Sequence, residues 1–319
     1  MTLTLRNTVA VAPAPFPLEG CAAAKWGPHS RVVASPGIAV VTIGSDGSLA
    51  WRTLLAPGQH PLHLQAVAVH GDRVRLYSGH PTGQTTVCLP DVQEFDILTG
   101  SLAGTTTMPQ GRKGMAALAH PDGRTLLVDG QDSGGKVHAS GFLHLPAGAE
   151  ESLFDDIFLP IPLREDVGVP TASAGVGIQI VKIRQNGKPR FLVLGNGNED
   201  GHPGEIVRRP GGLIRMVIAE DVTVPYASRS GRACSFGAGF VYAGGTDGNN
   251  QPTSQIVAWD GTPGTQPEVV GNLPHPITSP TVFASEKNVY ICGGYPTAPS
   301  GPVIPWGTVA TAEAMRLEF

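Results

Sequence analysis

The residues best able to do chemistry lie in one polar stretch, GNGNEDGHPGE, which spans 195–205. Within it, Glu199, Asp200 and His202 combine two carboxylates with an imidazole, and Asn198 adds an amide oxygen. Such a set can supply ligands to a divalent cation, or a general acid and base for proton transfer. Tight turns use the same residue types, so a solvated turn is the other interpretation of this stretch.

Two arginines offer a site for an anion. Arg112 and Arg232 each stand at the start of an apolar run, at 115–120 and 233–240, and Lys113 follows the first of them. A guanidinium held at such a position can bind a carboxylate or phosphate through two parallel hydrogen bonds. We therefore predict that Arg112, Lys113 and Arg232 bind ligand.

Histidines and aromatic residues extend this candidate site. His63 and His275 stand at equivalent entries to other apolar runs, and they are predicted to act as acid and base. A single histidine is usually satisfied by packing, whereas histidines facing one another in a channel can bind a metal. Tyr295, and Trp306 in the long segment 295–308, are predicted to contact a ligand. Further polar candidates follow or precede the apolar runs: His60, His80, Asn196, Gln131, Asp132, Arg229, Thr246, Asp247 and Asn249.

The elements that would position these residues recur along the chain. Six runs of apolar or β-branched residues end in glycine, at 40–44, 74–79, 126–130, 191–195, 240–245 and 289–294. Counted at residues 44, 79, 130, 195, 244 and 293, the spacings are 35, 51, 65, 49 and 49 residues. A recurring period of this length is typical of propellers and other repeat folds. We interpret each copy as one four-stranded blade, with a compact first blade and an insertion in the third.

Run length and composition favour strands over helices. Near-continuous apolar runs suit strands that are buried on both faces, as inner propeller strands are. Glycine at a strand end lets the backbone turn or approach a neighbour where a Cβ atom would clash. The chain has 42 Gly and 29 Pro but only 15% charged residues, a composition that suits many short strands joined by turns. We therefore predict an all-β fold.

Two further patterns recur along the chain together with these runs. An aromatic residue followed by Asp and then by Thr and Gly occurs at 93–100 and 256–262, and it predicts a strand ending in an Asx-type turn. Links that contain proline precede the next run, at 108–112, 161–164, 224–226 and 273–276.

The glycine pair, the aromatic–Asp pair and the Leu-Pro-x-x-Arg link together resemble the kelch family of β-propellers over nearly the whole chain. Only the fifth and sixth runs keep the family's double glycine, and the tryptophan that usually ends a kelch blade is mostly missing. In kelch repeats an arginine in the link often hydrogen-bonds carbonyls of the adjacent blade. The resemblance therefore implies a structural alternative for Arg112 and Arg232. The residue sets of copper-radical oxidases and iron-binding kelch proteins are not matched, and no organic cofactor is predicted.

The two ends of the chain predict how the fold is completed. The last repeat is one strand short, with strands expected at 281–285, 289–292 and 309–319, while 3–11 looks like an outer strand. The simplest solution has the N-terminal strand complete the last blade, which closes the ring and removes exposed edges. The prediction is one domain, 1–319, with six blades, or seven if 130–195 hides an extra one.

Composition excludes several function classes. The net charge is −4 and no basic stripe is present, so neither nucleic acid nor an anionic membrane is an expected partner. No window approaches the roughly 18 apolar residues that a membrane helix needs, and no signal peptide is expected. Cys21, Cys88, Cys234 and Cys292 are widely spaced. We predict free thiols, with the last three buried in strands, and a cytoplasmic location.

Two functional hypotheses remain. The first is a small-molecule enzyme that acts at the channel mouth by proton transfer, as an isomerase, cyclase or lyase would, with a divalent metal left open. The second is a non-catalytic module that holds a protein or glycan on one propeller face. The 6% aromatic content disfavours a sugar-binding lectin, which would need stacking surfaces on repeated blades.

Overall fold

The computed structural model describes most of the chain. The described residues are 3–18, 20, 22–84, 86–136, 138, 140–147, 157–162, 179–194, 201–208, 214–225, 231–247, 249, 251–296 and 310–319. None of these residues forms an α-helix, so none belongs to a helix that could cross a membrane.

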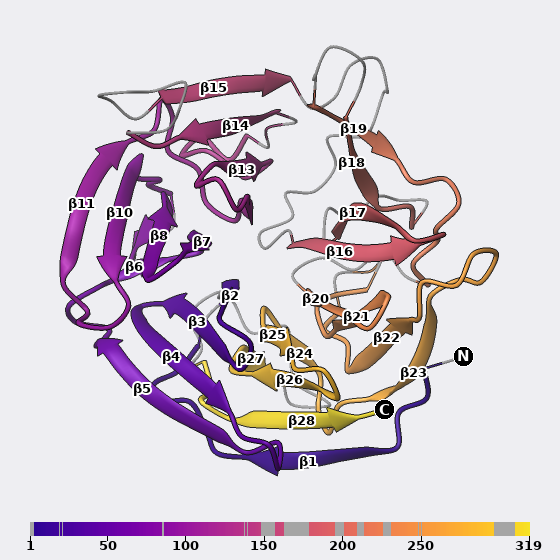
Figure 1. Cartoon of the computed structure of the whole chain (residues 1–319). Coiled ribbons are helices and arrows are strands. Elements are labelled where there is room, and N and C mark those ends of the chain that lie inside the picture. The colour runs from indigo at the N-terminus through magenta and orange to yellow at the C-terminus, as the bar shows by residue number, and fades with distance from the viewer. Residues whose placement is uncertain are drawn as a thin grey trace.

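The described residues form six four-stranded antiparallel sheets arranged in a ring (Figure 1). The first sheet contains β2 (Ala22–Trp26), β3 (Ser30–Ser35), β4 (Gly37–Ile43) and β5 (Leu49–Leu55). The second contains β7 (Ala66–His70), β8 (Arg73–Tyr77), β10 (Asp91–Asp96) and β11 (Leu102–Thr107). The third contains β12 (Ala116–Ala119), β13 (Thr125–Val128), β14 (Ser140–Leu145) and β15 (Ile157–Pro162).

In all six sheets the first strand named is the innermost and the last is the outermost. The fourth contains β16 (Gln179–Gln185), β17 (Lys188–Leu194), β18 (Gly204–Arg208) and β19 (Ile214–Ile218). The fifth contains β20 (Arg232–Phe236), β21 (Gly239–Ala243), β22 (Gln255–Trp259) and β23 (Glu268–Asn272). The sixth contains β25 (Thr281–Ala284), β26 (Asn288–Cys292), β28 (Ala314–Glu318) and β1 (Asn7–Val11).

This arrangement is a six-bladed all-β propeller. The inner strand of each sheet contacts the inner strands of its two neighbours, including β2 with β25. β1 is the outermost strand of the sixth sheet and pairs with β28 from Asn7 opposite Glu318 to Val11 opposite Ala314. Apolar side chains of adjacent sheets fill the spaces between blades, so the core is a series of interblade clusters.

The double-glycine geometry is present in more blades than the sequence suggests. In the fifth and sixth sheets, both glycines of each pair have positive φ angles, between 65° and 93°. Ser78 and Gly79 occupy the same place in the second sheet with φ of 56° and 110°, and Asp129 and Gly130 in the third with 57° and 95°. Serine and aspartate therefore adopt a left-handed conformation that L-residues visit at a cost of about 1–2 kcal/mol. The backbone geometry is kept although the first glycine is not.

The prediction for the first repeat is wrong by one strand. The run at 40–44 lies in β4, the third strand, whereas the other runs lie in second strands such as β8 and β13. The equivalent second strand is β3, and the glycine that follows it is Gly37, the first residue of β4, with a φ of 111°. The two strands are easily confused because both are apolar, and β4 is buried at all but one position. The first blade is therefore less compact than the spacing implies.

The Asx-type turns are confirmed, but one cysteine lies outside the expected strand. Asp96 Oδ1 accepts hydrogen bonds from the backbone N–H of Leu98 (3.0 Å) and Thr99 (2.9 Å), and Asp260 does the same for Thr262 (2.9 Å). Cys88 lies in the loop between β9 (His80–Pro81) and β10, not in a strand. Cys88, Cys234 and Cys292 are free thiols, as predicted.

A chain of polar side chains crosses the contact between the second and third sheets. The Tyr77 hydroxyl donates to Thr125 Oγ1 (2.9 Å) and lies 2.9 Å from His144 Nδ1. His70 Nε2 lies 2.9 Å from the same Thr125 oxygen. Tyr77, Thr125 and His144 are almost fully buried. Burial, together with the nearby Arg75 and His144, lowers the pKa of His70 to about 4.

We expect His70 to make stability depend on pH. The unfolded chain takes up a proton on His70 near the ordinary pKa of 6.5, whereas the folded protein resists it down to about 4. The unfolded state therefore binds more protons in this window, and the free energy of unfolding falls as pH is lowered from 6.5 to 4. Allowing for partial solvent access, the loss is about 2 kcal/mol. Urea unfolding at both pH values should show that His70→Gln loses less free energy of unfolding than wild type does. The control His29→Gln, at an exposed position, should lose as much as wild type.

We expect Gly79→Ala to be one of the more damaging glycine substitutions. A Cβ atom there would lie 2.5 Å from the backbone carbonyl of His63, at a φ that alanine rarely adopts. Backbone strain and overpacking each cost about 1–3 kcal/mol, so the free energy of unfolding should fall by about 3 kcal/mol. Gly71→Ala is the control, because its φ is also positive but nothing lies within 4 Å. Equal denaturation midpoints for the two variants would contradict the steric argument.

Candidate functional site

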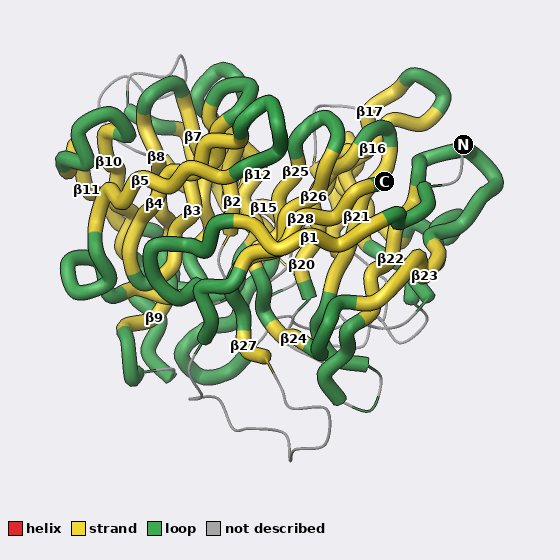
Figure 2. The backbone as a smooth tube through the Cα atoms, turned by 90° about the horizontal axis from the view of Figure 1, so that it is seen from below, coloured by secondary structure: helices red, strands yellow, loops and turns green. Residues whose placement is uncertain are grey.

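One face of the propeller gathers the links and the loops that follow the glycines. β6 (Leu62–His63) pairs with β9, and β24 (Ile277–Thr278) pairs with β27 (Tyr295–Pro296). In the third blade, Lys113 and Gln131 form an equivalent bridge. β9, β24 and β27 lie on the same side of the six sheets (Figure 2). We call this side the link face. The described members of both sets of polar residues that the sequence singles out therefore lie on it, while Asn196 and Arg229 lie outside the described residues.

Four predicted site residues, Asn198, Glu199, Asp200 and Trp306, lie outside the described residues. Of the predicted histidines, His202 places Nδ1 2.8 Å from the carbonyl oxygen of Val222, in the fourth blade. His275, in the sixth blade, places Nε2 3.8 Å from a Glu313 carboxylate oxygen. Tyr295 stands in β27 beside Thr278. The described members of the set are thus distributed over several blades.

His63 is part of a stacked pair of imidazoles. Its ring lies parallel to that of His80, with centroids 5.1 Å apart and an interplanar angle of 6°. His63 Nε2 is 2.8 Å from the Thr82 hydroxyl, and both histidines are 7% exposed. The pair is therefore held by packing and hydrogen bonding within the second blade.

Arg112 is anchored by backbone and side-chain oxygens. Its Nη1 donates to the carbonyls of Asp129 (3.2 Å) and Ser140 (2.6 Å), and Nη2 donates to Ser140 Oγ (3.1 Å) and Gln110 Oε1 (3.2 Å). The guanidinium also lies 4.7 Å from the centroid of the Phe142 ring. Burial lowers the pKa of Arg112 to about 10. These contacts resemble the structural role that kelch repeats give such an arginine, which hydrogen-bonds backbone carbonyls. Here, however, the carbonyls belong to the arginine's own blade and not to the adjacent one.

Arg232 reaches towards the axis. Its Nη2 donates to the carbonyl of Gly20 (3.0 Å), which lies in the link before the first sheet, and Nη1 donates to that of Gly231 (3.0 Å). A Cβ atom on Gly20 would overlap Leu64 and would lie 3.3 Å from Arg232 and 3.7 Å from Ser279. Residues from the first, second, fifth and sixth blades therefore meet at this point.

Among the described residues of the link face, Asp132 pairs with a histidine that the sequence does not single out. His138 Nε2 lies 2.8 Å from Asp132 Oδ2, and both residues stand in the loop between β13 and β14. Asp132 Oδ1 accepts hydrogen bonds from the backbone N–H groups of Gly134 (2.9 Å) and Lys136 (3.0 Å). The hydrogen bond from His138 lowers the pKa of Asp132, and the two backbone donors add to the effect. A loop-fixed carboxylate thus orients an imidazole, as a general base requires.

Other reactive groups surround this pair. The backbone N–H of Cys88 donates to Ser133 Oγ (2.8 Å), and the Cys88 thiol donates to the carbonyl of Gln131 (3.4 Å). Burial raises the pKa of Cys88, so the thiol stays protonated and is a poor nucleophile. The Lys113 ammonium opposes that shift, which places a positive charge near the same loop. The loop and the segments beside it therefore bring together a base, a cation and polar groups.

The described residues give no support for a metal centre. Among them, no three His, Cys, Asp or Glu side chains are grouped closely enough to hold an ion. A divalent metal at the polar stretch 195–205 stays a prediction.

Asp132 belongs to the predicted post-glycine loops, whereas His138 was missed. The available signal was a histidine six residues after Asp132 within a loop that contains Gly134 and Gly135. Loops of this composition are common, and only the closed loop brings the imidazole onto the carboxylate.

Comparisons with known proteins support the fold and give no information on the chemistry. No protein-family model matches the chain, and no curated protein matches it. The solved structure of YjhT is similar over 95% of each chain, with a TM-score of 0.69 and 12% identical residues. It belongs to a set of 738 matching chains, so the architecture is widespread and identifies no function. At this identity the likeness shows a shared six-bladed propeller fold, and the kelch resemblance stays a prediction.

Proposed function

We propose that the protein is a small-molecule enzyme that performs proton transfer on the link face, with His138 as the acid–base residue. The observation that carries the proposal is the 2.8 Å contact between His138 and a carboxylate that two backbone N–H groups hold in place. An imidazole oriented by a fixed carboxylate is a recurring arrangement for general acid–base catalysis.

The roles follow from this geometry. With Nε2–H donated to Asp132, His138 presents Nδ1 as the base that removes a proton from a substrate carbon or hydroxyl. Asp132 stabilises the resulting imidazolium, and the Lys113 ammonium attracts an anionic group of the substrate. Return of the proton to another atom gives an isomerisation, and its transfer to a leaving group gives an elimination.

Isotope exchange tests the proposal across several classes of substrate at once. The protein is incubated in D₂O with panels of 2-oxo acids, 2-hydroxy acids and reducing sugars, and deuterium entering C–H positions is followed by proton NMR. Wild type is expected to exchange at least one compound, and His138→Gln should slow that exchange about 10²- to 10⁴-fold. Asp132→Asn should also slow the exchange, because the imidazolium loses the charge that stabilises it.

A matched control is present on the opposite face. His120 Nδ1 lies 2.7 Å from Asp122 Oδ1 in the β12–β13 hairpin, so His120→Gln removes a similar but exposed pair. This variant should exchange at the wild-type rate. Unchanged exchange in His138→Gln would contradict the proposal. Ligand binding without any exchange would favour the alternative, a non-catalytic binding module.

A further inference from the structure

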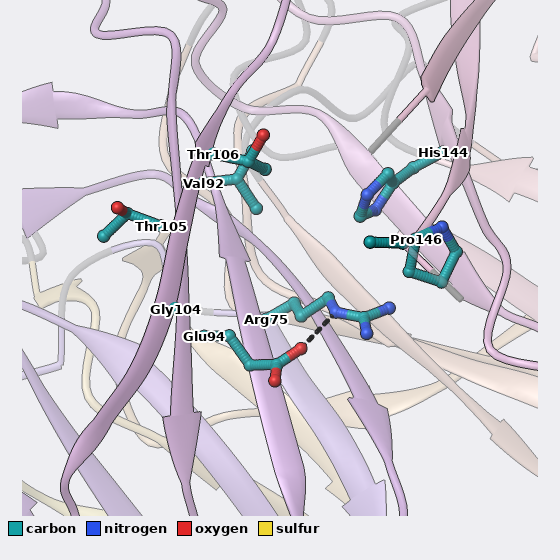
Figure 3. A pocket seen from close by; sticks show the side chains of 9 residues that line it. Arg75, Val92, Glu94, Gly104, Thr105, Thr106, His144 and Pro146 are labelled. Atoms are coloured by element: carbon teal, nitrogen blue, oxygen red, sulfur yellow. Dashed lines mark hydrogen bonds and ion pairs between the residues drawn. The ribbon is translucent and has the colours of Figure 1, made fainter. Parts of the chain in front are cut away.

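A polar cavity opens between the outer parts of the second and third blades, away from the link face. It has a volume of about 190 Å³ and is lined by Arg75, Glu94, Thr106 and His144, among others. In Figure 3 the Arg75–Glu94 pair and the His144 ring border the same space, whereas Thr105 points away from them. Because one water occupies about 30 Å³ of liquid, the cavity has room for about six water-sized groups.

Arg75 and Glu94 use only part of their hydrogen-bonding capacity on each other. Arg75 Nε donates to Glu94 Oε2 (2.5 Å), and Arg75 Nη1 donates to the carbonyl of Gly123 (3.0 Å). Within the described residues, none accepts a hydrogen bond from Arg75 Nη2 and none donates to Glu94 Oε1. One donor group and one acceptor atom of this ion pair thus remain available.

The fourth blade contains a comparable pair that is saturated. Arg190, also on a second strand, binds both oxygens of Glu205 (2.9 and 2.6 Å) and both oxygens of Asp221 (2.7 and 2.9 Å). In this fold, all three guanidinium nitrogens of an arginine on a second strand can therefore find hydrogen-bond acceptors. In the second blade, Glu94 is the one carboxylate among the described residues that contacts Arg75, and both residues line the cavity.

The buried hydrogen bonds between Tyr77, Thr125 and His144 determine which His144 nitrogen carries the hydrogen. Tyr77 donates to Thr125, so the contact between Tyr77 oxygen and His144 Nδ1 requires Nδ1 to carry the hydrogen. In this neutral tautomer Nε2 is the acceptor nitrogen. His144 is 1% exposed, so these hydrogen bonds hold its ring in place.

We propose that this cavity binds a small zwitterion of the α-amino acid type. Glu94 would accept hydrogen bonds from its ammonium, and Arg75 would donate hydrogen bonds to its carboxylate, in a cavity that Thr106 also lines. A lone anion would meet the charge of Glu94 and a lone cation that of Arg75, whereas a zwitterion matches both. A sugar is a poorer fit, because no Phe, Tyr or Trp among the described residues lines the cavity to stack against it.

Calorimetric titration of the full chain tests this site with glycine and L-alanine as zwitterions, and acetate and methylammonium as their halves. The zwitterions are expected to bind, and each half at least about ten-fold more weakly. Glu94→Gln should remove the advantage of alanine over acetate. Glu205→Gln, which alters the comparable pair of the fourth blade, should leave binding unchanged.

Thr106→Val is a milder second variant, should Glu94→Gln unfold, and it should weaken alanine binding several-fold. The proposal is overturned if acetate binds as tightly as alanine, if neither Glu94→Gln nor Thr106→Val weakens binding, or if no zwitterion binds up to about 10 mM. His138→Gln should bind alanine normally, which separates this site from the proposed enzyme activity.

Discussion

Deletion of residues 1–18 is expected to abolish cooperative unfolding of the protein at room temperature. β1 is the outermost strand of the sixth sheet, and the segment after it runs between the sixth and first sheets. The side chains of Phe16 and Leu18 are 8% and 0% exposed in the cluster that joins these two sheets. Both sheets therefore lose packing when the segment is removed.

The expected loss is large relative to total stability. Burying one large apolar side chain contributes about 1.5–3 kcal/mol, and the strand hydrogen bonds add to this. Leu18 also packs against Gly293 and accepts a backbone hydrogen bond from Gly294 (2.7 Å). A typical domain is stable by only about 5–15 kcal/mol, so this loss can remove most of it.

Chemical denaturation followed by fluorescence and circular dichroism checks the deletion. The truncated chain should unfold without a sharp transition, and a synthetic peptide of residues 3–18 added in trans should restore one. Leu18→Ala alone should lower the free energy of unfolding by about 2–5 kcal/mol. A truncated chain with the wild-type midpoint would show that β1 does not complete the sixth blade in solution.

Arg112→Met is expected to lower the free energy of unfolding by about 3–5 kcal/mol. Arg112 is 3% exposed, and its guanidinium donates to the carbonyls of Asp129 and Ser140. Methionine fills much of the same volume but leaves these acceptors unpaired, at a cost of about 1–3 kcal/mol each. Relief from burying a charge offsets part of that cost.

This variant also separates the two interpretations of Arg112. A structural arginine predicts lower stability, while a ligand-binding arginine predicts wild-type stability with lost binding. Arg52→Met is the matched control, because Arg52 donates to the carbonyls of Ile97 (2.7 Å) and Leu98 (3.1 Å) from an exposed position. Its loss should stay below about 1 kcal/mol. Equal denaturation midpoints for Arg112→Met and wild type would contradict the structural interpretation.

The candidate site was only partly predictable. The sequence placed links and post-glycine loops at the ends of strands, and β6–β9 and β24–β27 confirm that these segments meet on one face. It identified Asp132 but not its partner His138, because their contact depends on the path of the loop rather than on a fixed helical or strand spacing. The Arg75–Glu94 pair was missed because opposite charges on neighbouring strands are ordinary in sheets.

The sequence by itself determined the all-β class, the repeated blades and the Asx-type turns at Asp96 and Asp260, because these depend on local patterns of apolar residues, glycine and aspartate. Only the tertiary structure decided which apolar run of the first blade is the second strand, since β3 and β4 both face other sheets. It also decided that Cys88 lies in a loop and that Arg112 is tied to backbone carbonyls. Those outcomes depend on contacts between segments far apart in the chain, which no local pattern encodes.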